Sequence, residues 1–100
     1  MSPEAVKNLI RKGQTQSVLF MECPSASEII DHVQLISKKQ NGYILIGVKK
    51  CGTVVGLKRS ELQLQQRAQE AIKNTPLTLH LVTLITSINV IVISHKINNN

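Results

Sequence analysis

Aromatic residues are scarce in this chain of 100 residues, which has one Phe, one Tyr and no Trp. Proteins that grip single-stranded nucleic acid usually stack bases on aromatic rings, so only Phe20 and Tyr43 are available for that purpose. The core must be built from Ile, Leu and Val, and a hydrophobic content of 42% suffices for one domain. We expect a single domain over residues 1–97 and a disordered tail over 98–100.

Cysteines and long apolar runs are also scarce. Cys23 and Cys51 are too few and too far apart for a disulfide scaffold or a metal-binding pair, which favours free thiols in a reducing compartment. No apolar run approaches the roughly 18 residues that span a bilayer. The first residues, with Pro3 and Glu4, lack the apolar centre of a signal peptide. We therefore expect an intracellular protein, cytoplasmic or nuclear, without membrane contact.

Acidic residues are half as numerous as basic ones. Six Asp and Glu stand against twelve Lys and Arg, which gives a formal net charge of +6. This balance favours an anionic partner such as RNA or DNA. The alternative is that the lysines are simply solvated surface residues, as in many basic domains.

Helix and strand signals alternate along the chain. Pro3 near the start of an apolar-periodic segment and Gly13 at its end predict a short first helix. Ser25 and Glu28 form a capping box that predicts the start of a second helix. The full expected order is a helix at 3–12, a strand at 14–22, a helix at 26–40, strands at 43–48 and 53–55, a helix at 61–74, and strands at 77–85 and 88–94.

The order α-β-α-β-β-α-β-β predicts an α+β fold, in which helices pack on a single, mostly antiparallel sheet. The last two strands are apolar at successive positions, so both of their faces need cover. A small domain has few helices to provide it. A second copy or a partner subunit is therefore a further expectation.

The segment from Gly42 to Gly56 combines an apolar strand, a lysine pair and a glycine turn. It resembles the pattern Gly-Gly-hydrophobic-Leu-Ile-Gly-Val-Asp-Asp-x-Gly-x-Val-x-Gly of the Schlafen AlbA-2 domain family, also known as divergent AAA-4. Upstream, Gly13 to Met21 is similar to the family's glycine and acidic residue followed by Val-Glu-Phe-Lys. Downstream, Ile72 to Leu77 and the strands after it resemble the family's closing part, so the resemblance covers nearly the whole chain.

The resemblance implies a Schlafen AlbA-2-like fold and a nucleic-acid-associated domain, which in Schlafen proteins is a metal-dependent endoribonuclease that cuts structured RNA with acidic residues. The older family name suggests ATP binding. However, the glycine turn lacks the Gly-Lys-Ser/Thr ending of a phosphate-binding loop. The glycines are better explained by turns and close packing, and no cofactor is expected.

The acidic positions of the family carry other residues here. Gln14 stands at the first, Leu19 at the second, and Lys49 or Lys50 at the third. Divalent ions that assist phosphodiester cleavage are held by carboxylate oxygens, which amide, aliphatic and ammonium groups cannot replace. We therefore expect no catalytic residues, no metal site and no hydrolysis by this chain alone.

Basic residues near the glycine turn are candidate phosphate contacts. The family topology would place Lys49 and Lys50 beside Arg11 and Lys12, where they could neutralise phosphates without reading sequence. The alternative is that they are ordinary charged turn residues. A further basic pair, Lys58 and Arg59, precedes the start of a helix, where the helix dipole does not stabilise positive charge. The predicted nucleic-acid-binding residues are Arg11, Lys12, Lys49, Lys50, Lys58 and Arg59.

Other polar residues have simpler structural explanations. Lys38 and Lys39 fit the favourable interaction of cations with a helix C-terminus. The three histidines, His32, His80 and His95, lack a Cys or acidic residue spaced to complete a metal or nucleophile-base site.

Three functional hypotheses remain. The first is a non-catalytic Schlafen-like domain that binds the backbone of nucleic acid, RNA in preference to DNA. The alternative is a regulatory or structural subunit that pairs with a catalytically competent Schlafen-like endoribonuclease in an RNA-processing complex. The third, ranked last, is a nuclease with unorthodox ligands that include Glu22 and Gln14.

Overall fold

Three helices and four strands form the part of the chain that the computed structural model describes, residues 2–39, 41–58, 63–85 and 88–95. The predicted α+β class is confirmed. The predicted strand at 53–55 is reduced to a single antiparallel bridge between Val48 and Val54. The elements are α1 (Pro3–Lys12), β1 (Val18–Met21), α2 (Ala26–Ser37), β2 (Tyr43–Ile46), α3 (Gln63–Ala71), β3 (Leu77–Ile85) and β4 (Ile88–His95).

The four strands form one sheet in the order β1-β2-β4-β3. β1 and β2 are parallel, and α2 makes the crossover that parallel neighbours require. β4 is antiparallel to both β2 and β3, so the sheet is mostly antiparallel, as predicted. The expectation that the last two strands are neighbours is confirmed. The parallel pair places the carboxyl ends of β1 and β2 at the same end of the sheet.

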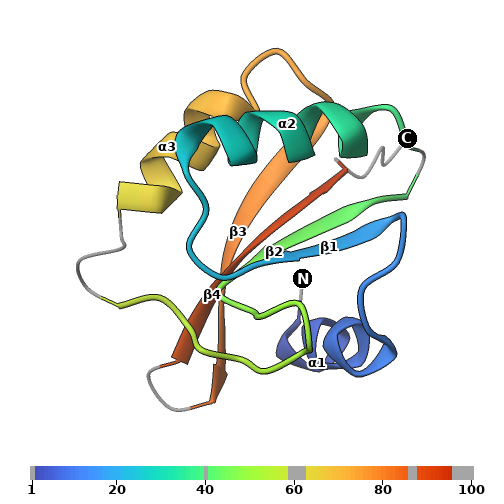
Figure 1. Ribbon diagram of the computed structural model, residues 1–100, viewed down its shortest axis with the longest axis vertical. Coiled ribbons are helices and arrows are strands. Elements are labelled where there is room, and N and C mark those ends of the chain that lie inside the picture. Colours follow the sequence, from blue (N-terminus) through green and yellow to red (C-terminus); the bar gives the residue numbers. More distant parts are fainter. Residues whose placement is uncertain (1, 40, 59–62, 86–87, 96–100) are drawn as a thin grey trace.

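The sheet lies between two helical layers (Figure 1), with α2 and α3 on one face and α1 on the other. Alternate strand residues contribute to the apolar clusters on the two faces of the sheet, because successive strand side chains point to opposite faces. Ile91 and Ile93 of β4 pack toward α2 and α3, whereas Val90 and Val92 pack with Val6 of α1. Both faces of β4 are therefore covered within the chain, and no partner is needed for that purpose.

The helix ends follow local signals. α1 has the predicted bounds, and the Ser2 hydroxyl caps it by accepting from the Ala5 N–H at 3.2 Å. The predicted capping box of α2 is present, with Ser25 and Glu28 bonded in both directions. α2 ends at Ser37, earlier than predicted. His95 Nε2 lies 2.9 Å from the Ile36 carbonyl oxygen, to which it donates, so the end of β4 is tied to the end of α2.

The outer edge of β1 is closed by the segment before it, which was predicted to be part of the strand. The Thr15 N–H donates to the Val18 carbonyl at 2.9 Å, and Thr15 Oγ1 accepts from the Val18 N–H at 3.1 Å. Gln14 Oε1 accepts from the Phe20 N–H at 3.1 Å. These bonds occupy backbone groups that a free edge would expose to another strand.

Candidate nucleic-acid interface

A tight hairpin turn follows β2 and presents the lysine pair. The Lys49 N–H donates to the Thr53 carbonyl at 2.9 Å, and the Gly52 N–H donates to the Lys49 carbonyl at 2.8 Å. Gly52 has a φ of 96°, the conformation that a three-residue hairpin loop requires at its last position. Both Lys49 and Lys50 are exposed in this turn. Among the described residues, neither ammonium group takes part in an ion pair, so both are available to an external partner.

This turn, Lys49–Gly52, rests against the C-terminal end of α1. A Cβ placed on Gly52 would lie 3.7 Å from the Ile10 carbonyl oxygen. Val48 and Val54, on either side of the turn, belong to the same apolar cluster as Val6, Leu9 and Ile10 of α1. The last turn of α1 carries Arg11 and Lys12, and both are exposed. The structure therefore brings together two segments that carry four of the predicted basic residues.

Lys58 is not brought to this group. After the turn, the N–H groups of Val55 and Gly56 both donate to the Gly47 carbonyl at 2.9 Å, and the Leu57 N–H donates to the Asn89 carbonyl at 2.9 Å. The segment thus leads away from α1 toward the start of β4 (Figure 1). Lys58 is exposed beyond that point, and Arg59 lies outside the described residues.

Cys51 lies in the same turn with its thiol exposed. Its Sγ is 3.3 Å from Thr53 Oγ1. The hydrogen bond from the Thr53 side chain lowers the pKa of Cys51, and a backbone hydrogen bond from Thr53 and the positive charge of Lys49 act in the same direction. Both positive charge and hydrogen bonding favour the thiolate. The turn therefore holds a thiol that ionises more readily than an ordinary one.

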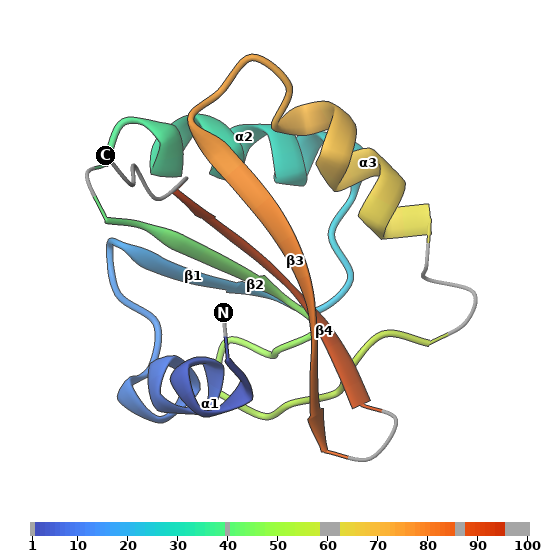
Figure 2. The ribbon, with the colours of Figure 1, turned by 180° about the vertical axis from the view of Figure 1, so that it is seen from behind.

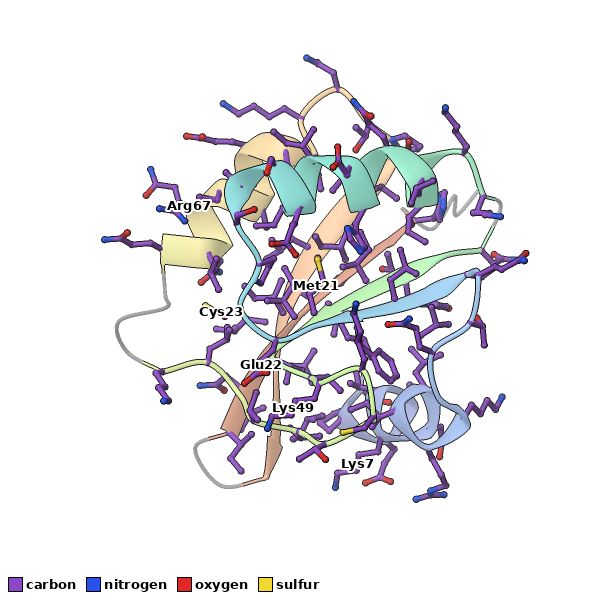
Figure 3. The ribbon with its side chains drawn as sticks, viewed as in Figure 1. Lys7, Met21, Glu22, Cys23, Lys49 and Arg67 are labelled. Atoms are coloured by element: carbon purple, nitrogen blue, oxygen red, sulfur yellow. The ribbon has the colours of Figure 1, made fainter. Side chains whose placement is uncertain are left out.

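A cleft of about 570 Å³ opens beside the turn, at the carboxyl ends of β1 and β2. Open sheets with parallel strands commonly bind ligands at this end. Lys49 and Lys50 contribute to one wall, and Glu22 and Glu28 contribute from the β1–α2 side. Figure 3 shows Glu22 and Lys49 on this side of the molecule. The complete lining is Phe20, Met21, Glu22, Cys23, Pro24, Glu28, His32, Lys49, Lys50 and Cys51.

His32 also lines this cleft, and a hydrogen bond determines its tautomer. Its Nδ1 lies 2.7 Å from the Glu28 carbonyl oxygen, which can only accept, so Nδ1 carries a proton. Sequence reasoning missed the cleft because it treated His32 and Glu22 as separate surface residues. The available signal was the helix between two apolar strands, which indicates a parallel crossover whose strands end together. Among the described residues, no three His, Cys, Asp or Glu side chains are placed to hold a metal ion.

The three positions at which the sequence resemblance implied acidic residues have separate roles here. The Gln14 amide oxygen is occupied by the Phe20 N–H. Leu19 packs against the apolar cluster under α2 and α3. Lys49 is exposed in the turn. These side chains offer no carboxylate, and the one oxygen among them closes a sheet edge.

No model of a known protein family matches this chain, and no curated protein matches it in sequence. Within the described ranges, none of the helices has the length and apolar character needed to cross a bilayer.

Proposed function

We propose that this chain is a Schlafen-like domain that binds the phosphate backbone of nucleic acid, RNA in preference to DNA, without cutting it. The observation that carries the proposal is the seating of the Lys49–Gly52 turn against the end of α1. It brings together two segments, far apart in the sequence, that carry four exposed cations. We name this surface the basic end and define it as Arg11, Lys12, Lys49 and Lys50.

The charges of the basic end are free for phosphates. In the described part of the chain, the one ion pair joins Lys7 to Glu4 at 3.7 Å, so none of the four cations is paired with a carboxylate there. Cations of this kind release counterions when they contact phosphates, which makes binding strong at low salt and independent of base sequence. Glu22 and Glu28 in the adjacent cleft repel phosphates, which favours a backbone path along the lysines.

The absence of a stacking surface supports backbone contact over base recognition. Phe20 is only 1% exposed, which leaves the half-buried Tyr43 as the one other aromatic side chain. Sequence-tolerant grip by base stacking needs exposed rings. Affinity must then come mainly from charge, and its salt dependence is the feature to measure.

The double substitution Lys49→Glu with Lys50→Glu tests the proposal. Loss of two phosphate contacts should weaken binding at least about tenfold and reduce the slope of log affinity against log salt by about 1.5. The measurement is fluorescence anisotropy of labelled hairpin RNA and duplex DNA over a salt series. Manganese is included in one series so that any cutting would be seen on a gel.

The matched control is Lys38→Glu with Lys39→Glu, which makes the same charge change at an exposed pair beyond the end of α2. This control should lose little affinity, because it changes only the long-range field and not a contact. Equal losses in the two double variants would show that net charge alone drives binding, and the basic end would not be the site. Unchanged affinity in the Lys49 and Lys50 variant would also refute it.

A further inference from the structure

The two edges of the sheet are treated differently. The outer edge of β1 is closed by Gln14 and Thr15, as described above. β3 forms the other edge, and Figure 2 shows no further strand beside it. Within the described residues, no hydrogen bond other than those to β4 reaches the backbone from Thr78 to Leu84. This edge therefore offers a row of free donors and acceptors.

The sequence of β3 carries few of the devices that protect edges. Its nine residues, Leu-Thr-Leu-His-Leu-Val-Thr-Leu-Ile, include no Lys, Arg, Asp, Glu, Pro or Gly. Natural edge strands usually carry charges, proline or bulges that prevent pairing with another chain. The one irregularity in the described ladder is a register shift between Thr83 and Ile85, near the end of the strand.

Leu81 lies at the centre of this edge and is 44% exposed, although Ile91, directly opposite it on β4, is fully buried. The helices thus leave the middle of β3 uncovered on the face that Leu81 shares with Leu77 and Leu79. A partner that adds a strand here would cover an apolar side chain as well as the backbone groups. An extended segment is the only shape that satisfies both.

We infer that this partner is β3 of a second copy, paired antiparallel about a two-fold axis at Leu81. In this register Leu81 faces its own symmetry mate, His80 faces Val82, and Leu79 faces Thr83. Residues of one face meet residues of the same face, because the side-chain period is two. The result is an isologous interface in which two sheets become one.

Charge explains why a second copy fits although the chain carries a net charge of +6. The strand that would meet its own copy contains no Lys, Arg, Asp or Glu, and His80 does not face itself in this register. Nine residues give a strand about 30 Å long, so the pairing can be continuous over several hydrogen bonds. The basic end is built from α1 and the turn after β2, so it contributes no residue to this edge.

The test combines two substitutions at the symmetric position. Leu81→Lys and Leu81→Glu each place like charges directly opposite one another across the axis and remove the apolar contact. Each variant alone should raise the dimer dissociation constant at least about tenfold by analytical ultracentrifugation. Mixing them should restore a dimer that contains one copy of each, detected by native mass spectrometry. Leu35→Lys, at a leucine 56% exposed on α2, is the control and should leave the dimer intact.

Far-UV circular dichroism of each variant would show that its fold is retained. A wild-type chain that stays monomeric at high concentration would overturn the inference and would point to a strand from a different protein. Dimers unaffected by Leu81→Lys would overturn it as well. Monomeric single variants that fail to form a mixed dimer would refute the register about Leu81. None of these results depends on RNA binding, which is measured separately at the basic end.

Discussion

Gly47 is the residue on which the position of the lysine-bearing turn depends most directly. It has a φ of 106°, its N–H donates to the Met21 carbonyl at 2.7 Å, and its carbonyl accepts two N–H groups from the returning segment. A Cβ at this position would lie 3.3 Å from the Gly56 carbonyl carbon and 3.3 Å from Val90 Cγ1. Gly47→Ala therefore combines an unfavourable backbone conformation with crowding against backbone atoms.

The expected cost follows from these two contributions. A left-handed conformation costs a residue with a Cβ about 1–2 kcal/mol, and overpacking of a buried site adds about 1–3 kcal/mol. Gly47→Ala should thus lower the free energy of unfolding by about 2–5 kcal/mol. Gly13 is the matched control, because its φ is 86° but a Cβ there would meet nothing within 4 Å. Gly13→Ala should cost about 1–3 kcal/mol through backbone strain alone, because a ψ of 173° places Gly13 in a region that residues with a Cβ rarely adopt.

Urea unfolding followed by far-UV circular dichroism measures both values. The crowding at Gly47, about 1–3 kcal/mol, corresponds to a gap of about 4–24 °C between the melting temperatures of the two variants. Equal stabilities would refute the reasoning, because they would mean that the segment after the turn does not approach Gly47 as closely as described. At a temperature where both are folded, Gly47→Ala should also bind hairpin RNA more weakly, since the turn must move.

Two further predictions concern the closed outer edge of β1 and the thiol of Cys51. Gln14→Ala should destabilise the fold by about 0.5–1.5 kcal/mol and should speed exchange of the Phe20 amide hydrogen, measured by NMR. Gln14→Glu keeps an acceptor oxygen and should have neither effect. Identical exchange in the wild type and both variants would contradict the proposed closure of the β1 edge. In a Cys23→Ser background, Thr53→Val should raise the pKa of Cys51, so that half-maximal alkylation by iodoacetamide occurs at a higher pH than with Thr53 present. An unchanged pH profile would show that Thr53 does not stabilise the thiolate.

Elements with strong local signals were predictable from the sequence. The bounds of α1 and the start of β3 agree with prediction, because Pro3, Gly13 and Pro76 mark them through backbone constraints that act locally. The strand at 14–22 was predicted too long, since Gln14 and Thr15 use their side chains to cap an edge. That role depends on which strand lies at the edge, and hydrophobic pattern does not reveal it.

The candidate site was predictable only in part. The grouping of Arg11 and Lys12 with the lysine turn was expected from a resemblance in topology, and the contact at Ile10 supplies its physical basis. The separation of Lys58 was not foreseen, because it depends on the bond from the Leu57 N–H to a distant strand. The cleft was missed for the same reason, since its walls come from segments that meet only when β1 and β2 pair in parallel.

The placement of β4 between β2 and β3 governs how the molecule can be assembled. β3 is complete in the sequence before β4 begins, yet the sheet order gives it no neighbour until β4 arrives. As the chain emerges from a ribosome, β2 and β3 therefore remain with apolar surface exposed until β4 has been synthesised. β4 then completes the β2–β4 and β4–β3 ladders in a single late step. Chaperone contact during synthesis should accordingly persist until the residues of β4 have left the exit tunnel.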